Sequence, residues 1–165
     1  MAEESAMPML PEQIWRRRLD SEYAEMEKSG ERFEVNAERT RYLVSVRGAG
    51  LYRSGDAVLR KDAHSVQIDL LREYPYPGGI DVTWLTPIFH PNIHEKDGKV
   101  CIQLINNWAE GQTILSVVRA LKQLLENPNT KDPLNRDAAV YFDAHPEALA
   151  GGALPVKSGP RIIRV

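Results

Sequence analysis

Four short segments between residues 33 and 84 alternate apolar and polar side chains with a period of two. Successive side chains of a strand point to opposite faces, so this pattern predicts four antiparallel strands with one buried face. Turn-forming residues at 48–50 and 54–56 predict a long connection between the second and third strands. The apolar series is Phe33 and Val35, then Tyr42, Val44 and Val46, then Val66, Ile68 and Leu70, then Ile80, Val82 and Trp84.

A helix is predicted before this sheet. Pro11 suits the first turn of a helix that runs to about Ser29, and Gly30 would end it. Residues 16–18 are consecutive arginines, and a helix turns by about 100° per residue, so they cannot all point inward. They form either a solvated basic flank or a docking edge for an acidic partner.

Two further helices are predicted after the sheet. Thr113 can cap a helix through Glu126, whose apolar residues gather on one side and make it the most amphipathic segment of the chain. Another helix runs roughly from Asn135 to Ala144. The order of helix, four-stranded antiparallel meander, irregular loop, central helix and further helix predicts an α+β single domain, with the sheet packed on the central helix.

The predicted core domain occupies residues 9–150. Residues 1–8 are expected to form a flexible leader. Glycines and prolines in 151–165 exclude one continuous helix there, which predicts an atypical C-terminal tail. A chain of 165 residues is long enough for one domain with a proper hydrophobic core.

Composition argues against several classes of partner. The formal net charge of −2 gives a nucleic-acid partner no electrostatic support. No apolar run approaches membrane-spanning length, and the acidic start lacks the basic region and apolar core of a signal peptide. A lone cysteine cannot form an intramolecular disulfide. We therefore expect no nucleic-acid partner, no membrane partner and a cytoplasmic location.

The lone cysteine, Cys101, closely follows the turn-forming residues 96–98. One thiol excludes a zinc site built on two or four cysteines, which leaves an inert buried cysteine or a nucleophile. The turn places the thiol close to a surface loop. Positive charge from Lys96 and Lys99 favours the thiolate that would react.

Several motifs between residues 74 and 139, taken in order, resemble those of a ubiquitin-conjugating enzyme. The resemblance runs from about residue 10 to residue 149, and the family fold agrees with the predicted order of strands and helices. The motifs are Tyr74-Pro75-Tyr76-Pro77, His90-Pro91-Asn92-Ile93, Gly98, Cys101, Trp108, Thr113, Pro128, Asp132-Pro133-Leu134-Asn135 and Ala138-Ala139.

The resemblance implies that Cys101 accepts ubiquitin or a ubiquitin-like modifier from an activating enzyme as a thioester, and that a substrate lysine then takes it. No metal or organic cofactor is implied. Asn92 matches the family asparagine that stabilises the oxyanion, and its alternative role is to brace the loop. Asp132 matches the acid that orients the acceptor lysine, and its alternative role is to cap a turn before Pro133.

One histidine near the cysteine, together with the proline that follows it, is interpreted structurally. His90 and Pro91 are expected to hold a turn. A metal site built from His90, His94 and Cys101 is not expected, because Pro91 prevents the simple helical geometry that would align the two histidines.

The resemblance also implies partner surfaces. The first helix, with Arg16 and Arg17, would meet the activating enzyme and a ligase. Tyr76 would lie in a ligase-binding loop, and Trp108 would support the loop beside the thiol. Residues 109–111, Ala-Glu-Gly, replace the pair usual in the second loop that binds RING-type ligases. These departures, together with the tail, indicate a divergent member of the family.

Two other function classes remain open at the level of the sequence. One is a non-catalytic module that binds a ubiquitin-like modifier, although variants of that kind lack the cysteine that is present here. The other is an independent cysteine hydrolase, which would need one of the four histidines as a base.

Overall fold

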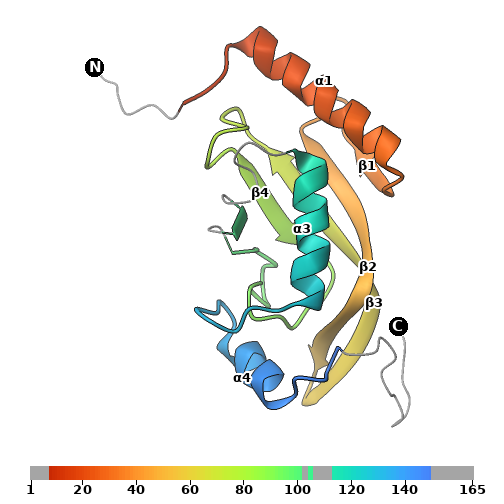
Figure 1. Ribbon diagram of the computed structural model, residues 1–165, viewed down its shortest axis with the longest axis vertical. Coiled ribbons are helices and arrows are strands. Elements are labelled where there is room, and N and C mark those ends of the chain that lie inside the picture. Colours follow the sequence, from red (N-terminus) through yellow and green to blue (C-terminus); the bar gives the residue numbers. More distant parts are fainter. Residues whose placement is uncertain (1–7, 102–103, 106–112, 150–165) are drawn as a thin grey trace.

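A four-stranded antiparallel sheet forms the centre of the computed structural model, which describes residues 8–101, 104–105 and 113–149. The strand order is β1-β2-β3-β4, so each strand pairs with the next along the chain (Figure 1). The predicted meander is therefore confirmed. The strands are β1 (Phe33–Val35), β2 (Arg41–Ser54), β3 (Ala57–Leu70) and β4 (Ile80–Trp84).

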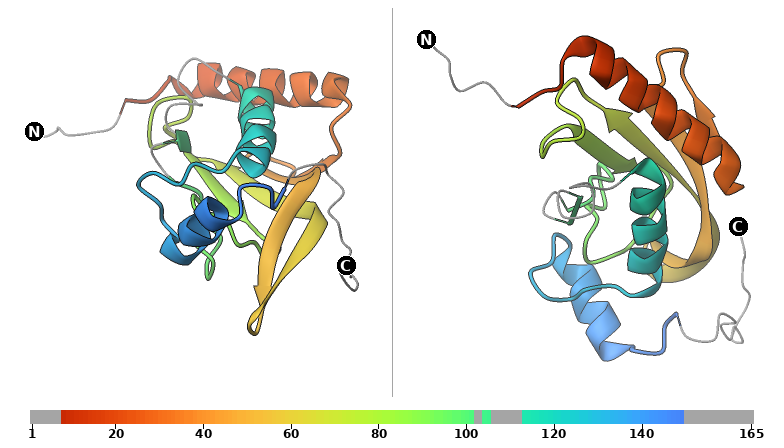
Figure 2. Two further views of the ribbon diagram at one scale, coloured as in Figure 1. Left: turned by 60° about the horizontal axis from the view of Figure 1, so that its bottom comes forward. Right: turned by 45° about the horizontal axis from the view of Figure 1, so that its top comes forward.

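The prediction of a long connection between the second and third strands is wrong. β2 and β3 each continue for 14 residues as a long hairpin (Figure 2), and the glycines at 48 and 50 lie at an irregularity inside the ladder. A Cβ at Gly50 would lie 2.8 Å from the His64 ring and 3.0 Å from Leu125. Glycine here allows close packing and does not end the strand.

Three helices surround the sheet. α3 (Ile114–Glu126) lies across the inner face of the curved sheet, with α1 (Glu12–Ser29) at one end and α4 (Arg136–Ala144) at the other (Figures 1 and 2). Each begins and ends within one residue of its predicted range. Local signals explain this agreement, because Thr113 and Asn135 cap α3 and α4 through their side chains.

The main core lies between the sheet and α3. The predicted inward-facing residues of β2, β3 and β4 are all buried, whereas Phe33 and Val35 of β1 are only partly buried. The α3 side of this core is formed by the apolar residues that gave the helix its amphipathic pattern. They are Ile114, Leu115, Val117, Val118, Leu121, Leu124 and Leu125.

A second, smaller core lies at the far end of the hairpin. Leu51 of β2 and Phe89 pack there with Ala138 and Phe142 of α4. The long hairpin is thereby joined to α4 and to the segment that leads to the cysteine. The part of the hairpin beyond the main core is therefore held in place by packing against α4.

A buried carboxylate connects α1 to α3. Glu22 is 2% exposed and accepts hydrogen bonds from Arg18 Nε (2.8 Å), Tyr74 Oη (2.5 Å) and the backbone N–H of Ile114 (2.8 Å). Arg18 therefore turns toward the interior of the protein, whereas Arg16 and Arg17 stay exposed. The carboxylate also lies at the positive end of the α3 dipole, where negative charge is favourable.

None of the described helices is both long and apolar enough to cross a bilayer. The predicted leader and tail, residues 1–8 and 151–165, lie outside the described residues except for Pro8.

Candidate active site

The segment from Phe89 to Cys101 forms an irregular loop attached to the edge of β4. The Trp84 N–H donates to the Gly98 carbonyl (2.7 Å), and the Val100 N–H donates to the Val82 carbonyl (3.3 Å). Gly98 has a φ of 74°, and a Cβ there would collide with the Trp84 backbone. Only glycine fits this turn without displacing β4.

Cys101 follows buried Val100 and is itself partly exposed. Its N–H donates to the Asn92 carbonyl (3.0 Å), and its carbonyl accepts from the Ile105 N–H (3.1 Å). The backbone of the cysteine is thus held on both sides, and the residue is partly exposed to solvent. This is the combination that a nucleophile on a rigid support requires.

Asn92 braces this loop against the segment between α3 and α4. Its side chain is nearly buried, with Nδ2 donating to the Asn129 carbonyl (3.0 Å) and Oδ1 accepting from the Asn129 N–H (3.0 Å). The two bonds use one of the two Nδ2 hydrogens. The other hydrogen has no hydrogen-bond acceptor in the described part of the chain.

His90 belongs to the same framework. It is 1% exposed, its Nδ1 accepts from the Asn92 N–H (3.0 Å), and its Nε2 lies 2.8 Å from the Leu124 carbonyl at the end of α3. The carbonyl acceptor requires that Nε2 carry the hydrogen. Burial lowers the pKa of His90 to about 4, so the ring is neutral near pH 7 and both nitrogens are engaged. Neither nitrogen is left to bind a metal.

Pro91 completes the connection to the α4 side. Its carbonyl accepts from the N–H groups of Leu134 (2.8 Å) and Asn135 (3.0 Å). Three successive residues, 90–92, therefore contact the end of α3, the start of α4 and the segment between them. The hydrogen bonds of the His-Pro-Asn triplet therefore fix the segment between α3 and α4 relative to the loop that carries Cys101.

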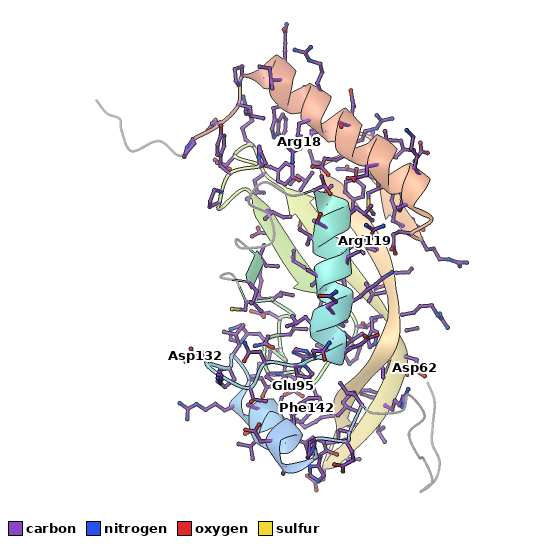
Figure 3. The ribbon with its side chains drawn as sticks, in the orientation of Figure 1. Arg18, Asp62, Glu95, Arg119, Asp132 and Phe142 are labelled. Carbon is purple, nitrogen blue, oxygen red and sulfur yellow. The ribbon has the colours of Figure 1, made fainter. Side chains whose placement is uncertain are left out.

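Asp132 lies on that segment and is exposed to solvent (Figure 3). Its backbone has a φ of 52°, which is uncommon for a residue other than glycine. None of the described residues donates a hydrogen bond to its carboxylate. The side chain is therefore free to meet a cation arriving from solvent.

The described partner residues that the sequence predicted belong to α1 and to the loop between β3 and β4, at the end of the molecule opposite Asp132 (Figures 1 and 3). Arg16 and Arg17 are exposed on α1, and Tyr76 is 36% exposed in the loop between β3 and β4. Arg72 of this loop lies over Trp15 of α1, with Cζ 5.0 Å from the ring centroid. The two predicted partner elements are thus side by side. Trp108 and residues 109–111 lie outside the described residues.

One ionic cluster near the cysteine loop could not be predicted from the sequence. Arg53, near the tip of the hairpin, binds Glu95 through Nε (3.0 Å) and Nη2 (2.5 Å) and binds Asp137 through Nη1 (3.2 Å). Its guanidinium also lies 4.5 Å from the centroid of the Phe89 ring. The partners are 42 and 84 residues from Arg53, so only the fold reveals the cluster.

A groove of about 410 Å³ opens beside this cluster, between residues 94–97 and residues 134–137. It adjoins the Pro91 contacts with Leu134 and Asn135 and therefore lies next to the loop that returns to Cys101. A larger hollow of about 650 Å³, lined by Arg47, His64 and Lys122 among others, contains neither the cysteine loop nor Asp132. Cys101 and Asp132 do not line the smaller groove either, but residues 94–97 of the cysteine loop do.

Comparison with known proteins supports the resemblance. The family model described as ubiquitin-conjugating enzyme matches residues 18–152. The chain is 34% identical over 83 residues to "Ubiquitin conjugating enzyme E2 B" of Dictyostelium discoideum, a match that covers 50% of this chain and 55% of that protein. It is 36% identical over 83 residues to "Protein PEROXIN-4" of Arabidopsis thaliana, covering 40% and 53%. The match spans about half the length of these curated relatives.

Solved structures agree on the fold. The E2 domain of a Toxoplasma gondii ubiquitin conjugating enzyme superposes with a TM-score of 0.63 at 21% identity, covering 84% of this chain and 91% of that chain. A structure titled "Novel Ubiquitin-Conjugating Enzyme" gives a TM-score of 0.61 at 22% identity, covering 81% and 88%.

Proposed function

The chain belongs to the ubiquitin-conjugating enzyme family, and from this we propose that it carries ubiquitin or a ubiquitin-like modifier as a thioester on Cys101 and transfers it to a substrate lysine. The observation that carries the proposal is that Cys101 is partly exposed and that its backbone is held by Asn92 and Ile105. A fully buried cysteine would have excluded the role.

The first step is thiol exchange. The Cys101 thiolate attacks the carbonyl of the modifier's terminal glycine, which arrives as a thioester on the activating enzyme. A new C–S bond forms, the old C–S bond breaks, and the thiolate of the activating enzyme leaves. Sulfur suits this step because its thiolate is accessible near neutral pH and its acyl ester reacts readily with amines.

The second step is attack by a neutral lysine amine on the Cys101 thioester. A C–N bond forms, the C–S bond breaks, Cys101 leaves as a thiolate, and the amine gives up a proton to solvent. The uncommitted Nδ2 hydrogen of Asn92 is the donor we assign to the oxyanion, a contribution of about 3 to 4 kcal/mol in other acyl transfers. The exposed Asp132 carboxylate attracts and orients the lysine.

Partners follow from this chemistry. An activating enzyme, a modifier and substrate proteins are required, and a RING-type ligase would use the surface formed by α1 and the Tyr76 loop. Exposed Arg16 and Arg17 would contact an acidic face of the activating enzyme or ligase. The exchange itself requires no metal or organic cofactor.

A hydrolase is less well supported, because it would need a histidine base at the thiol. His90 is buried and fully bonded, and His64 is bonded through Nε2 to the Gly48 carbonyl (2.9 Å). Among the described residues, none of the four histidines in the sequence is hydrogen-bonded to the Cys101 thiol.

The test is a charging assay with an activating enzyme, ATP and a panel of ubiquitin-like modifiers. We expect an adduct that a thiol reductant removes. The chain has one cysteine, so such an adduct is assigned to Cys101 without mapping. Cys101→Ala should form none, and Cys101→Ser should form an oxygen ester that the reductant leaves intact.

Failure to charge with every modifier would contradict the proposal. Binding of a modifier without an adduct would instead favour the non-catalytic module. Cleavage of a preformed isopeptide bond, lost in Cys101→Ala, would favour the hydrolase.

A cytoplasmic location is part of the proposal and rests on the single cysteine. Three of the matched relatives bear peroxin-4 or PEX4 names, and they come from Arabidopsis thaliana, Gibberella zeae and Dictyostelium discoideum. Fractionation of cells that express the tagged chain would decide between the cytosol and organelle membranes. Recovery with an organelle pellet would overturn the cytoplasmic assignment.

A further inference from the structure

The larger hollow, of about 650 Å³, has a basic lining that includes no residue of the cysteine loop. Arg32, Arg47 of β2 and Lys122 of α3 supply three cations, whereas Glu31 supplies the only carboxylate of the lining. His64 also lines the hollow, but burial lowers its pKa, so it adds no charge near pH 7. The lining therefore carries a net positive charge.

The one carboxylate of the lining is already neutralised. Lys122 Nζ donates to both carboxylate oxygens of Glu31 (2.8 and 2.9 Å). Arg32 and Arg47 are exposed, and neither guanidinium has an ionic or hydrogen-bonded partner among the described residues. Two unpaired cations on one concave surface raise the local concentration of anions.

Negative charge near the lining does not cancel this excess. Asp62, which precedes the lining residue Ala63, is bound by Arg60 Nε (2.9 Å). Glu126 approaches the backbone of Gly48, where an added Cβ would lie 3.8 Å from its Oε2. If Glu126 is counted with the lining, three cations still stand against two carboxylates.

Three hydroxyl groups of the lining add uncharged donors. They belong to Ser45, Ser65 and Thr86. Thr86 Oγ1 accepts from the Ser65 N–H (3.2 Å), but its own hydrogen has no acceptor among the described residues, and the same holds for both serine hydroxyls. Guanidinium and hydroxyl donors around one space match a ligand group with several acceptor oxygens, which is the chemistry of a phosphate.

The size and polarity of the hollow indicate a ligand larger than one phosphate ion. Small-molecule sites commonly enclose about 300 to 1,000 Å³, and this hollow falls within that range. Val46 and Ala63 are the only lining residues with aliphatic side chains, which disfavours an apolar ligand. Two unpaired guanidinium groups provide one fork for each of two linked phosphates.

We propose that the hollow formed by residues 30–32, 45–47 and 63–65 with Thr86 and Lys122 binds a small molecule that carries a diphosphate group. The inference goes beyond the proposed function, because no residue of the cysteine loop takes part in it. The diphosphate could be inorganic pyrophosphate or part of a nucleotide, and the two sources are separate arms of the test.

The experiment titrates the full-length, uncharged chain with inorganic pyrophosphate, ADP or adenosine and follows the backbone NMR signals. We expect saturable shifts at residues 30–32, 45–47 and 63–65 with pyrophosphate and ADP, a Kd on the order of 1 mM, and no such shifts with adenosine. Higher salt should weaken the binding. Tighter binding of ADP than of pyrophosphate would identify a nucleotide as the ligand, and equal binding would identify the diphosphate as the whole determinant.

Matched variants separate the hollow from net charge. Arg32→Ala/Arg47→Ala should raise the Kd for pyrophosphate at least about fivefold. Lys96→Ala/Arg136→Ala removes two exposed positive charges that do not line the hollow, and it should keep the Kd. Urea unfolding of each variant verifies that it is folded.

A third variant should bind more tightly. Glu31→Gln removes the lining carboxylate and releases Lys122, so the Kd should fall by about twofold to fivefold, an effect that loss of folding cannot produce. Absence of saturable shifts, shifts scattered over exposed lysines and arginines, or equal effects of the two double variants would overturn the inference. Charging of Cys101 is not needed, so failure of the proposed function would leave this test intact.

Discussion

The side chain of Asn92 and the backbone of Asn129 exchange two hydrogen bonds, each 3.0 Å long. This pair joins the cysteine loop to the segment that carries Asp132. The Asn92 side chain therefore supports the loop. The further role that we propose for it at the oxyanion has a different experimental signature.

Asn92→Ala should lower the free energy of unfolding by about 1 to 3 kcal/mol, because the Asn129 N–H and carbonyl lose their partners. If Asn92 also stabilises the oxyanion, discharge onto free lysine should slow by at least about 100-fold while charging continues. Urea unfolding and single-turnover discharge measure the two effects. Loss of stability with an unchanged discharge rate would leave the bracing role alone.

Asp132→Asn should slow discharge onto lysine by about tenfold and leave stability nearly unchanged. The carboxylate has no hydrogen bond to a described residue, and asparagine tolerates the observed φ of 52°. The decisive measurement is the ratio of discharge to charging rates. An equal fall in both rates, or a large loss of stability, would contradict the assigned role.

Glu22→Gln should lower the free energy of unfolding by about 3 kcal/mol. Donors converge on both carboxylate oxygens, and an amide replaces one of those acceptors with a donor. Glu12→Gln, at an exposed position on the same helix, serves as the matched control and should change stability by less than about 0.5 kcal/mol. Similar effects of the two substitutions would show that the buried network contributes little.

Stability should fall as the pH is lowered from about 6.5 toward 4. Burial lowers the pKa of His90 to about 4 from its ordinary 6.5, so the unfolded chain binds this proton first. The stabilisation is complete above pH 6.5 and is lost progressively below it. Burial also lowers the pKa of His64, which adds to the same trend.

The check is urea unfolding between pH 4 and pH 8. His90→Asn should reduce the slope of stability against pH, whereas His145→Gln, at an exposed site, should keep it. An unchanged slope in His90→Asn would exclude His90 as a source of the pH dependence.

Gly98→Ala should be far more harmful than Gly55→Ala. Both glycines have positive φ, 74° and 59°, but an added Cβ at Gly98 collides with the Trp84 backbone, whereas at Gly55 it has no neighbour within 4 Å. We expect a loss of about 1 to 2 kcal/mol for Gly55→Ala and at least about 3 kcal/mol for Gly98→Ala. Thermal unfolding compares them, and equal losses would show that the loop can move away from β4.

Local patterns in the sequence determined the elements of this fold. The alternation of β2 to β4, the amphipathic run of α3 and the caps at Thr113 and Asn135 act over a few residues, so the strands and helices could be predicted. The motif around Cys101 could be recognised for a related reason, because its residues are closely spaced along the chain.

Tertiary structure decided what these elements do together. The glycines at 48 and 50 predicted that the second strand would end there. In the structure, His64 and Leu125 pack against Gly50 and the hairpin continues. Only that continuation places Arg53 beside Glu95 and Asp137. Glu22 likewise meets Ile114 from 92 positions away. Contacts at such separations depend on the packing of whole elements, and no local pattern of side chains encodes them.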